Sequence, residues 1–109
     1  MKYVIAWTYR LNGSAAENDQ SLRRGLVLFS KWTTPSSTTY HQFVGRADGG
    51  GGFAVIETDN PSDLTDATGK FGHLLDYQIY PVVDIDQSAQ SMEEGAEFRE
   101  LDQIGRQPR

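Results

Sequence analysis

The chain has 109 residues, of which 38% are hydrophobic and none is cysteine, and its formal net charge is −5. This length is typical of one domain, and the negative charge argues against a nucleic-acid partner, whose phosphates need a dense basic surface. Because cysteine is absent and no segment approaches the about 18 apolar residues of a membrane span, we expect a cytoplasmic protein without disulfides, thiolate catalysis or membrane insertion.

Residues 2–10 predict a β-strand, because they combine β-branched and aromatic side chains and contain neither glycine nor proline. Both alternating sets of side chains are largely apolar, which indicates a strand covered on both faces. Ser14 and Glu17 then have the spacing of a capping box, in which hydroxyl and carboxylate satisfy amide groups at a helix start. An amphipathic helix is therefore predicted over residues 15–32.

Four consecutive glycines, Gly49–Gly52, separate two predicted strands at residues 39–46 and 53–58. A phosphate-binding loop needs a helix directly after the glycines, with Lys and Ser or Thr at fixed positions, whereas a strand follows here. We therefore interpret the glycines as the turn of a β-hairpin. A turn this flexible leaves the register of the two strands open.

The second half of the chain predicts a short helix and a fourth strand. Asn60 and Pro61 provide an N-cap and a proline at the first helical position, and the helix is expected to end near Gly72. Residues 77–85 predict the fourth strand, and Pro81 places it at a sheet edge because proline cannot donate to the ladder.

Residues 87–109 predict a third, marginal helix and a flexible tail, with Ser91 and Glu94 at capping-box spacing. Negative charge is concentrated in this half of the chain, since residues 61–109 contain ten Asp or Glu and four Lys or Arg. A surface of this kind is either solvated or a docking site for a partner.

The predicted order of elements is β-α-β-β-α-β, the ferredoxin-like arrangement, in one domain over residues 1–86. This α+β fold has an antiparallel four-stranded sheet with both helices on one face. The other face is left bare, and the apolar side chains of residues 2–10 require a cover for it. A second copy of the same sheet is the simplest cover, so we predict a homodimer.

Several segments resemble a functionally uncharacterised family of short ferredoxin-like proteins of the dimeric α/β-barrel type. The resemblance covers about residues 1–86 and is carried by MKYVIAWTYR, TYHQFVGR, GGFAVIET, DNPSDL and DYQIYPVVDI. The wider superfamily to which the chain is similar includes cofactor-independent monooxygenases, haem-degrading enzymes and muconolactone-type isomerases. These enzymes use a cavity between sheet and helices or between two sheets, so the resemblance implies a small-molecule site without choosing a reaction.

His41 and Glu57 are the candidate catalytic residues. If Gly45 pairs with Phe53 in the hairpin, His41 faces Glu57 on the same sheet face, and the carboxylate orients a histidine that acts as general acid and base. A shift of the register by one residue places the two side chains on opposite faces.

Trp7, Tyr9 and Phe43 are the candidate substrate-binding residues, as aromatic walls of a pocket for a flat ligand. Packing in the core or a dimer interface is the alternative for these rings. His73 lies near where haem-degrading relatives keep an iron-ligating histidine, but the first strand contains no asparagine. We therefore expect no cofactor and no metal.

Two functions follow as main hypotheses, beside a third, a protein that binds haem or a haem product. The first is a dimeric protein that binds a small aromatic or hydrophobic molecule, and that acts as a cofactor-independent monooxygenase or isomerase-like enzyme through His41 and Glu57. The alternative is a non-catalytic dimeric module that binds a ligand or a partner protein. The sequence leaves open whether the protein is an enzyme.

Overall fold

The computed structural model describes residues 1–106, with side chains described through residue 101, so the last residues of the predicted tail lie outside the described part. Four strands, three helices and one short 3₁₀ turn follow each other along the chain. They are β1 (Lys2–Tyr9), α1 (Ala15–Lys31), β2 (Thr39–Gly45), β3 (Gly51–Glu57), η1 (Pro61–Asp63), α2 (Leu64–Phe71), β4 (Leu75–Val82) and α3 (Ile85–Arg106).

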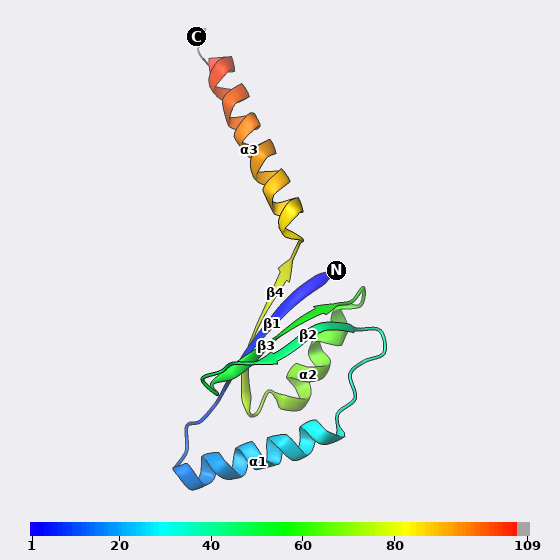
Figure 1. The fold of residues 1–109 in the computed structure, drawn as a ribbon, viewed down its shortest axis with the longest axis vertical. Helices are drawn as coiled ribbons and strands as arrows, with labels where there is room; N and C mark the ends of the chain where they lie inside the picture. Colours follow the sequence, from blue (N-terminus) through cyan, green and yellow to red (C-terminus); the bar gives the residue numbers. More distant parts are fainter. Residues whose placement is uncertain (107–109) are drawn as a thin grey trace.

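The strands form one antiparallel sheet in the order β2-β3-β1-β4. Helices α1 and α2 lie on one face of this sheet, whereas α3 extends away from it beyond the end of β4 (Figure 1). The predicted α+β class with a four-stranded antiparallel sheet is confirmed, and Pro81 lies in an edge strand as predicted. None of the described helices is long and apolar enough to cross a membrane.

The core lies between the sheet and the two helices that cover it. Alternation along β1 turns Tyr3 and Ile5 toward the helices, and the antiparallel register brings Ile56 and Ala54 of β3 opposite them. All four side chains are buried. The alternate side chains of β1 and β3 lie on the other face, which no described helix covers; we call it the bare face.

The predicted N-terminus of α1 is confirmed in detail. Ser14 is the N-cap, its hydroxyl accepts from the Glu17 amide, and the Glu17 carboxylate accepts from the Ser14 amide. These two reciprocal bonds satisfy amide donors that the first helical turn leaves unpaired.

The glycine run is a turn only in its first half. Gly49 has a φ of 76°, which glycine adopts without steric cost, whereas Gly51 and Gly52 already belong to β3. The strand therefore begins two residues earlier than predicted. Gly52 is required there because the indole of Trp7 lies over it: a Cβ at this position would come within 2.3 Å of the ring.

Two other boundaries also differ from the prediction. β4 begins at Leu75, because its side chain is buried and its backbone pairs with Tyr9. α3 begins at Ile85, since the Asp84 carbonyl accepts from amides in the first turn, and Ser91 and Glu94 therefore lie inside the helix and do not cap it. The predicted boundary after residue 86 thus falls inside a helix.

We expect Gly52→Ala to lower the free energy of unfolding by about 1–3 kcal/mol, because the added methyl group overlaps Trp7. Gly45 is the matched control: it pairs with Gly52 across the hairpin, and a Cβ there would meet no described atom within 4 Å. Gly45→Ala should therefore change the stability by less than about 1 kcal/mol. Urea unfolding measures both values, and equal losses would contradict the steric explanation.

The carboxylate of Asp63 connects the loop before β2 to the end of β3. Its Oδ2 accepts hydrogen bonds from Ser37 at 2.5 Å, from Thr38 at 2.8 Å and from Thr58 at 2.8 Å. These bonds, the one from Ser37 first, hold the pKa of Asp63 below its usual range.

This network predicts part of the acid sensitivity of the fold. Because the pKa of Asp63 is lower in the folded chain, its stabilising contribution is present above the unfolded-state pKa of about 3.9 and is lost as the pH falls through the folded value. Asp63→Asn should therefore lose less stability than the wild type between about pH 5 and pH 2. Parallel curves of unfolding free energy against pH would contradict this assignment.

Candidate functional site

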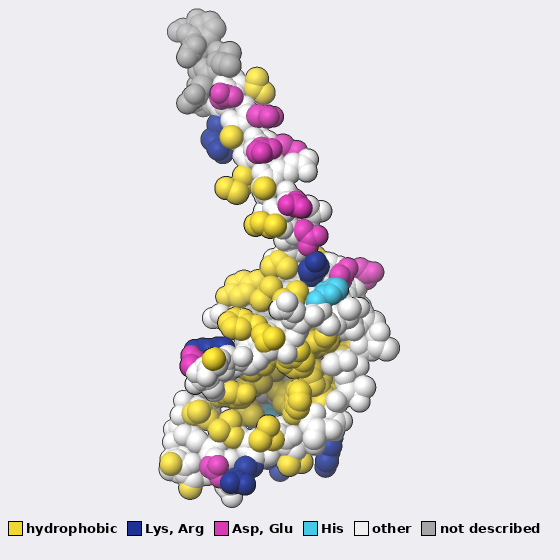
Figure 2. Space-filling model, in the orientation of Figure 1, with side chains coloured by type: hydrophobic (Ala, Val, Ile, Leu, Met, Phe, Trp, Pro, Cys, Tyr) yellow, Lys and Arg dark blue, Asp and Glu magenta, His cyan; other side chains and the backbone are white. Residues whose placement is uncertain are grey.

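An apolar cavity of about 640 Å³ lies between α1 and the helix-covered face of the sheet. Figure 2 shows it as a hollow lined with hydrophobic side chains. The volume falls within the about 300–1,000 Å³ typical of small-molecule sites. Strand residues contribute five aromatic rings to its walls, namely those of Trp7, Tyr9, Tyr40, Phe43 and Tyr77.

The floor of the cavity contains small residues of the neighbouring strands β2 and β3. Gly45 and Gly52 pair with each other, and Ala54 lies beside them, opposite Phe43. Gly45 and Ala54 line the cavity. Large aromatic residues lie around these positions and form the walls of the cavity. The spacing of small and large side chains thus opens a space that a uniformly large set would fill.

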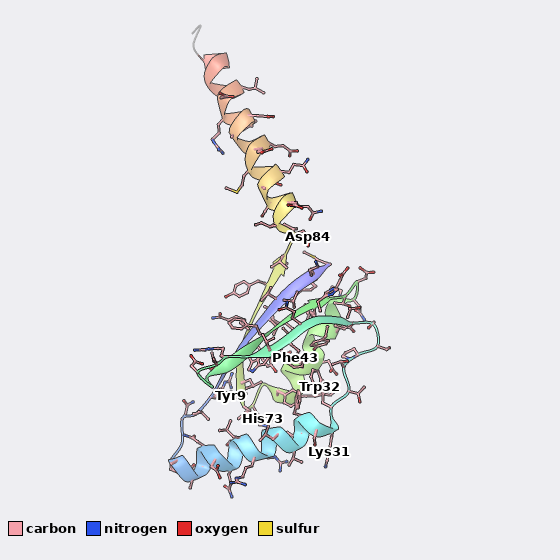
Figure 3. The ribbon with its side chains drawn as sticks, in the orientation of Figure 1. Tyr9, Lys31, Trp32, Phe43, His73 and Asp84 are labelled. Carbon is pink, nitrogen blue, oxygen red and sulfur yellow. The ribbon has the colours of Figure 1, made fainter. Side chains whose placement is uncertain are left out.

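The roof is α1, which is held at two points. At its C-terminal end, Trp32 donates from Nε1 to Asp66 Oδ2 at 2.8 Å, and its ring packs edge-on against Phe71 at 5.4 Å between centroids. Figure 3 shows Trp32 where the end of α1 meets α2. Further along the helix, Gly25 lies directly on Leu74, which a Cβ would approach to 2.4 Å.

Phe43 connects the aromatic walls to one another. Its ring centroid lies 5.5 Å from that of Trp7 in an edge-to-face arrangement and 5.9 Å from that of Phe29 on α1. Such geometries are favourable for aromatic pairs beyond their burial. The side chain nevertheless remains 43% exposed, so one part of it is available to a ligand.

The cavity is electrically neutral. No charged side chain is found among the described residues that line it. Burial, with a further effect of nearby Tyr40, raises the pKa of Tyr77 to about 12. Burial also raises the pKa of Tyr40, with a smaller effect of Asp66. Both phenols are therefore protonated at neutral pH and can donate hydrogen bonds.

The predicted substrate-binding residues Trp7, Tyr9 and Phe43 all line this cavity. Alternation along β1 places the first two on the face of Ile5, and the register of the hairpin places Phe43 there as well. Sequence reasoning did not select Tyr40, Tyr77 or the aromatic residues of the helices. The alternation of side chains along β4 could have indicated that Tyr77 lies on the face that α1 and α2 cover.

His41 and Glu57, the predicted catalytic pair, also lie close together, but their strands have a different register from the predicted one and the pair is not on the cavity side of the sheet. His41 Nε2 lies 2.8 Å from Glu57 Oε1, with both side chains about half exposed. Gly45 pairs with Gly52, so the hairpin has neither of the two predicted registers. The register shifts between Tyr40 and Gln42, and this irregularity at His41 brings its side chain to Glu57. The pair thus lies on the bare face, away from the cavity.

The same margin of the bare face carries two more charged groups. Lys2 pairs with Glu57 along the ladder, and its Nζ lies 2.8 Å from Asp84 Oδ1. This hydrogen bond raises the pKa of Lys2 and lowers that of Asp84. His73, by contrast, is exposed in the turn after α2 and does not line the cavity. Among the side chains described, those of residues 1–101, no group of three or more His, Cys, Asp or Glu could hold a metal.

A protein-family model matches most of the chain. Residues 1–96 match an uncharacterised family, and the matched range contains all four strands, α1 and α2. No curated protein matches the chain. Because the match covers most of the sequence, the chain belongs to the family described as Domain of unknown function (DUF3303).

Proposed function

We propose that the protein binds a small, flat, hydrophobic molecule in the cavity between α1 and the sheet. The observation that carries this proposal is the combination of a floor of small residues with walls of aromatic rings. A close-packed core would place side chains above Gly45, whereas a Cβ there would meet no described atom within 4 Å and the aromatic rings line an open space.

The chemistry of the walls supports a flat ligand. Trp7 and Phe43 already pack edge to face, and a flat aromatic ligand can make contacts of the same kind with these rings. A ligand that removes about 500 Å² of apolar surface from water, counting its own surface and that of the lining, gains about 12 kcal/mol from burial, and a cost of association of about 4 kcal/mol leaves about 8 kcal/mol. Micromolar affinity is therefore the order of magnitude we expect.

Binding, not catalysis, is the function that the cavity supports. General acid–base catalysis by His41 and Glu57 stays a prediction, because the pair lies on the bare face and cannot reach a ligand under α1. A reaction at this pair requires a substrate on the bare face.

The neutral fluorescent probe N-phenyl-1-naphthylamine tests the binding site. We expect saturable binding with about micromolar affinity. Gly45→Leu should weaken it at least about fivefold, because the new side chain enters the cavity from a position where a Cβ meets no described atom within 4 Å. Gly69→Leu is the matched control, since Gly69 is also unobstructed but lies outside the cavity lining. Wild-type protein that does not bind the probe, or equal affinities of the two variants, would contradict the proposal.

We also propose that the protein is a homodimer of ferredoxin-like domains in which the bare faces of two sheets pack together. The strand order and the two helices on one face support this topology. The bare face exposes apolar side chains that a monomer would leave in water, among them Val44, Phe53 and Tyr80. A second copy covers them with the same residues.

Light scattering after size-exclusion chromatography tests the dimer. The wild type should elute with twice the chain mass of 12.2 kDa. Phe53→Glu should elute as a monomer, because it places a charge in the centre of the bare face. Val27→Glu, at an exposed apolar residue of α1, should remain a dimer. A monomeric wild type, or equal effects of both variants, would argue against this interface.

A further inference from the structure

We propose that the ligand is an uncharged aromatic compound with a hydrogen-bond acceptor, of the class of aromatic ketones, and that the hydroxyls of Tyr40 and Tyr77 bind this acceptor. The inference rests on the binding function proposed above and specifies the chemical class of its ligand. The evidence is the set of polar side-chain atoms in the cavity and the hydrogen bonds that these atoms already make.

Polar side-chain atoms are few in this cavity. Among its described lining residues they are tyrosine hydroxyls and indole N–H groups. The N–H group of Trp32 is already bonded to Asp66. The hydroxyls of Tyr40 and Tyr77, in contrast, have no hydrogen-bond partner within the described part of the chain, whereas the Tyr80 hydroxyl on the bare face donates to Gln78 at 2.9 Å. The Tyr9 hydroxyl and the Trp7 N–H group also bond to no described residue, so four donors are left for solvent or for a ligand. Of these, the hydroxyls of Tyr40 and Tyr77 are the ones whose pKa is raised by burial.

The two tyrosines approach the cavity from opposite edges of the sheet. Tyr40 lies on β2 and Tyr77 on β4, and both lie on the face that α1 and α2 cover. Tyr40 packs edge-on against Trp32, and Tyr77 pairs with Trp7. The ring that carries the Tyr40 hydroxyl is thus packed against an indole, and Tyr77 lies beside Trp7 in the neighbouring strand. An acceptor on a flat ligand can receive a bond from either side.

Charge excludes other ligand classes. Burial penalises a negative charge at Tyr40 and Tyr77, and an anionic ligand in the same space meets the same penalty. The described lining provides neither Lys, Arg nor His to neutralise it, and no carboxylate to pair with a cation. Asp66, the carboxylate bonded to the lining residue Trp32, is also bound by Lys70.

Three compounds of matched shape test the inference by displacement of N-phenyl-1-naphthylamine: fluorene, 9-fluorenone and fluorene-9-carboxylate. We expect the ketone to bind about two- to tenfold tighter than fluorene, the range of one neutral hydrogen bond. The carboxylate should bind at least about tenfold more weakly than the ketone, since its charge loses hydration without a counter-charge. Equal affinities of ketone and hydrocarbon, or tightest binding of the carboxylate, would overturn the inference.

Variants identify the donors. Tyr77→Phe and Tyr40→Phe should each reduce the preference for the ketone, and the double variant should abolish it, while affinity for fluorene stays within about twofold. Tyr80→Phe is the matched control and should keep the preference, because its hydroxyl lies outside the cavity. A preference that survives the double variant would overturn the role of the tyrosines. If none of the compounds displaces the probe, the binding function itself fails; if fluorene and ketone bind equally, only the acceptor inference fails.

Discussion

The contact between Trp32 and Asp66 determines the architecture of the candidate site, because it fixes how α1 sits above the sheet. The indole bonds to a carboxylate on α2, and the same ring touches Phe71 and Phe43. Lys70 also bonds to Asp66. The hydrogen bond from Lys70 has the largest effect on the pKa of Asp66, and together with the bond from Trp32 it holds this pKa below its usual range. One end of the helix is thus fixed by a charge-assisted bond and aromatic packing. The apolar side chains of α1 nearer its centre are left facing a cavity instead of a filled core.

The two faces of the sheet have different chemistry as a result. The face under α1 offers aromatic rings and neutral donors, with no charge among its described lining residues. The bare face combines exposed apolar side chains with a charged margin that contains His41, Glu57 and Lys2. α3 starts beside this margin and exposes Ile85 and Met92 along its length. The proposed ligand site and the proposed dimer interface therefore lie on different faces of the sheet.

Much of the fold could be predicted from the sequence, because its determinants are local. The capping box at Ser14, the proline at the start of η1 and the alternation of β1 each specify structure through neighbours in the chain. Alternation also placed Trp7 and Tyr9 on one face, and both line the cavity. The elements and their order therefore follow from short-range patterns.

The remaining features depend on contacts between distant residues. Gly52 belongs to a strand because of an indole 45 positions earlier in the chain, at Trp7, and local composition alone indicates a turn. The irregularity at His41 offsets the register by one residue, which no alternation pattern reveals. The height of α1 above the sheet depends on Asp66, which lies 34 residues after Trp32. For this reason the sequence identified several walls of the cavity but not its roof.

The central claim is that a flat ligand lies between α1 and the sheet. The most direct measurement is an isotope-filtered nuclear Overhauser experiment on methyl-labelled protein with bound N-phenyl-1-naphthylamine. The cavity predicts contacts from the probe to the methyl groups of Ile5 and Leu74, which line it. Val4 and Val55 pair on the bare face and should show none. Contacts to Val4 and Val55 without contacts to Ile5 and Leu74 would place the ligand on the opposite face and contradict the account.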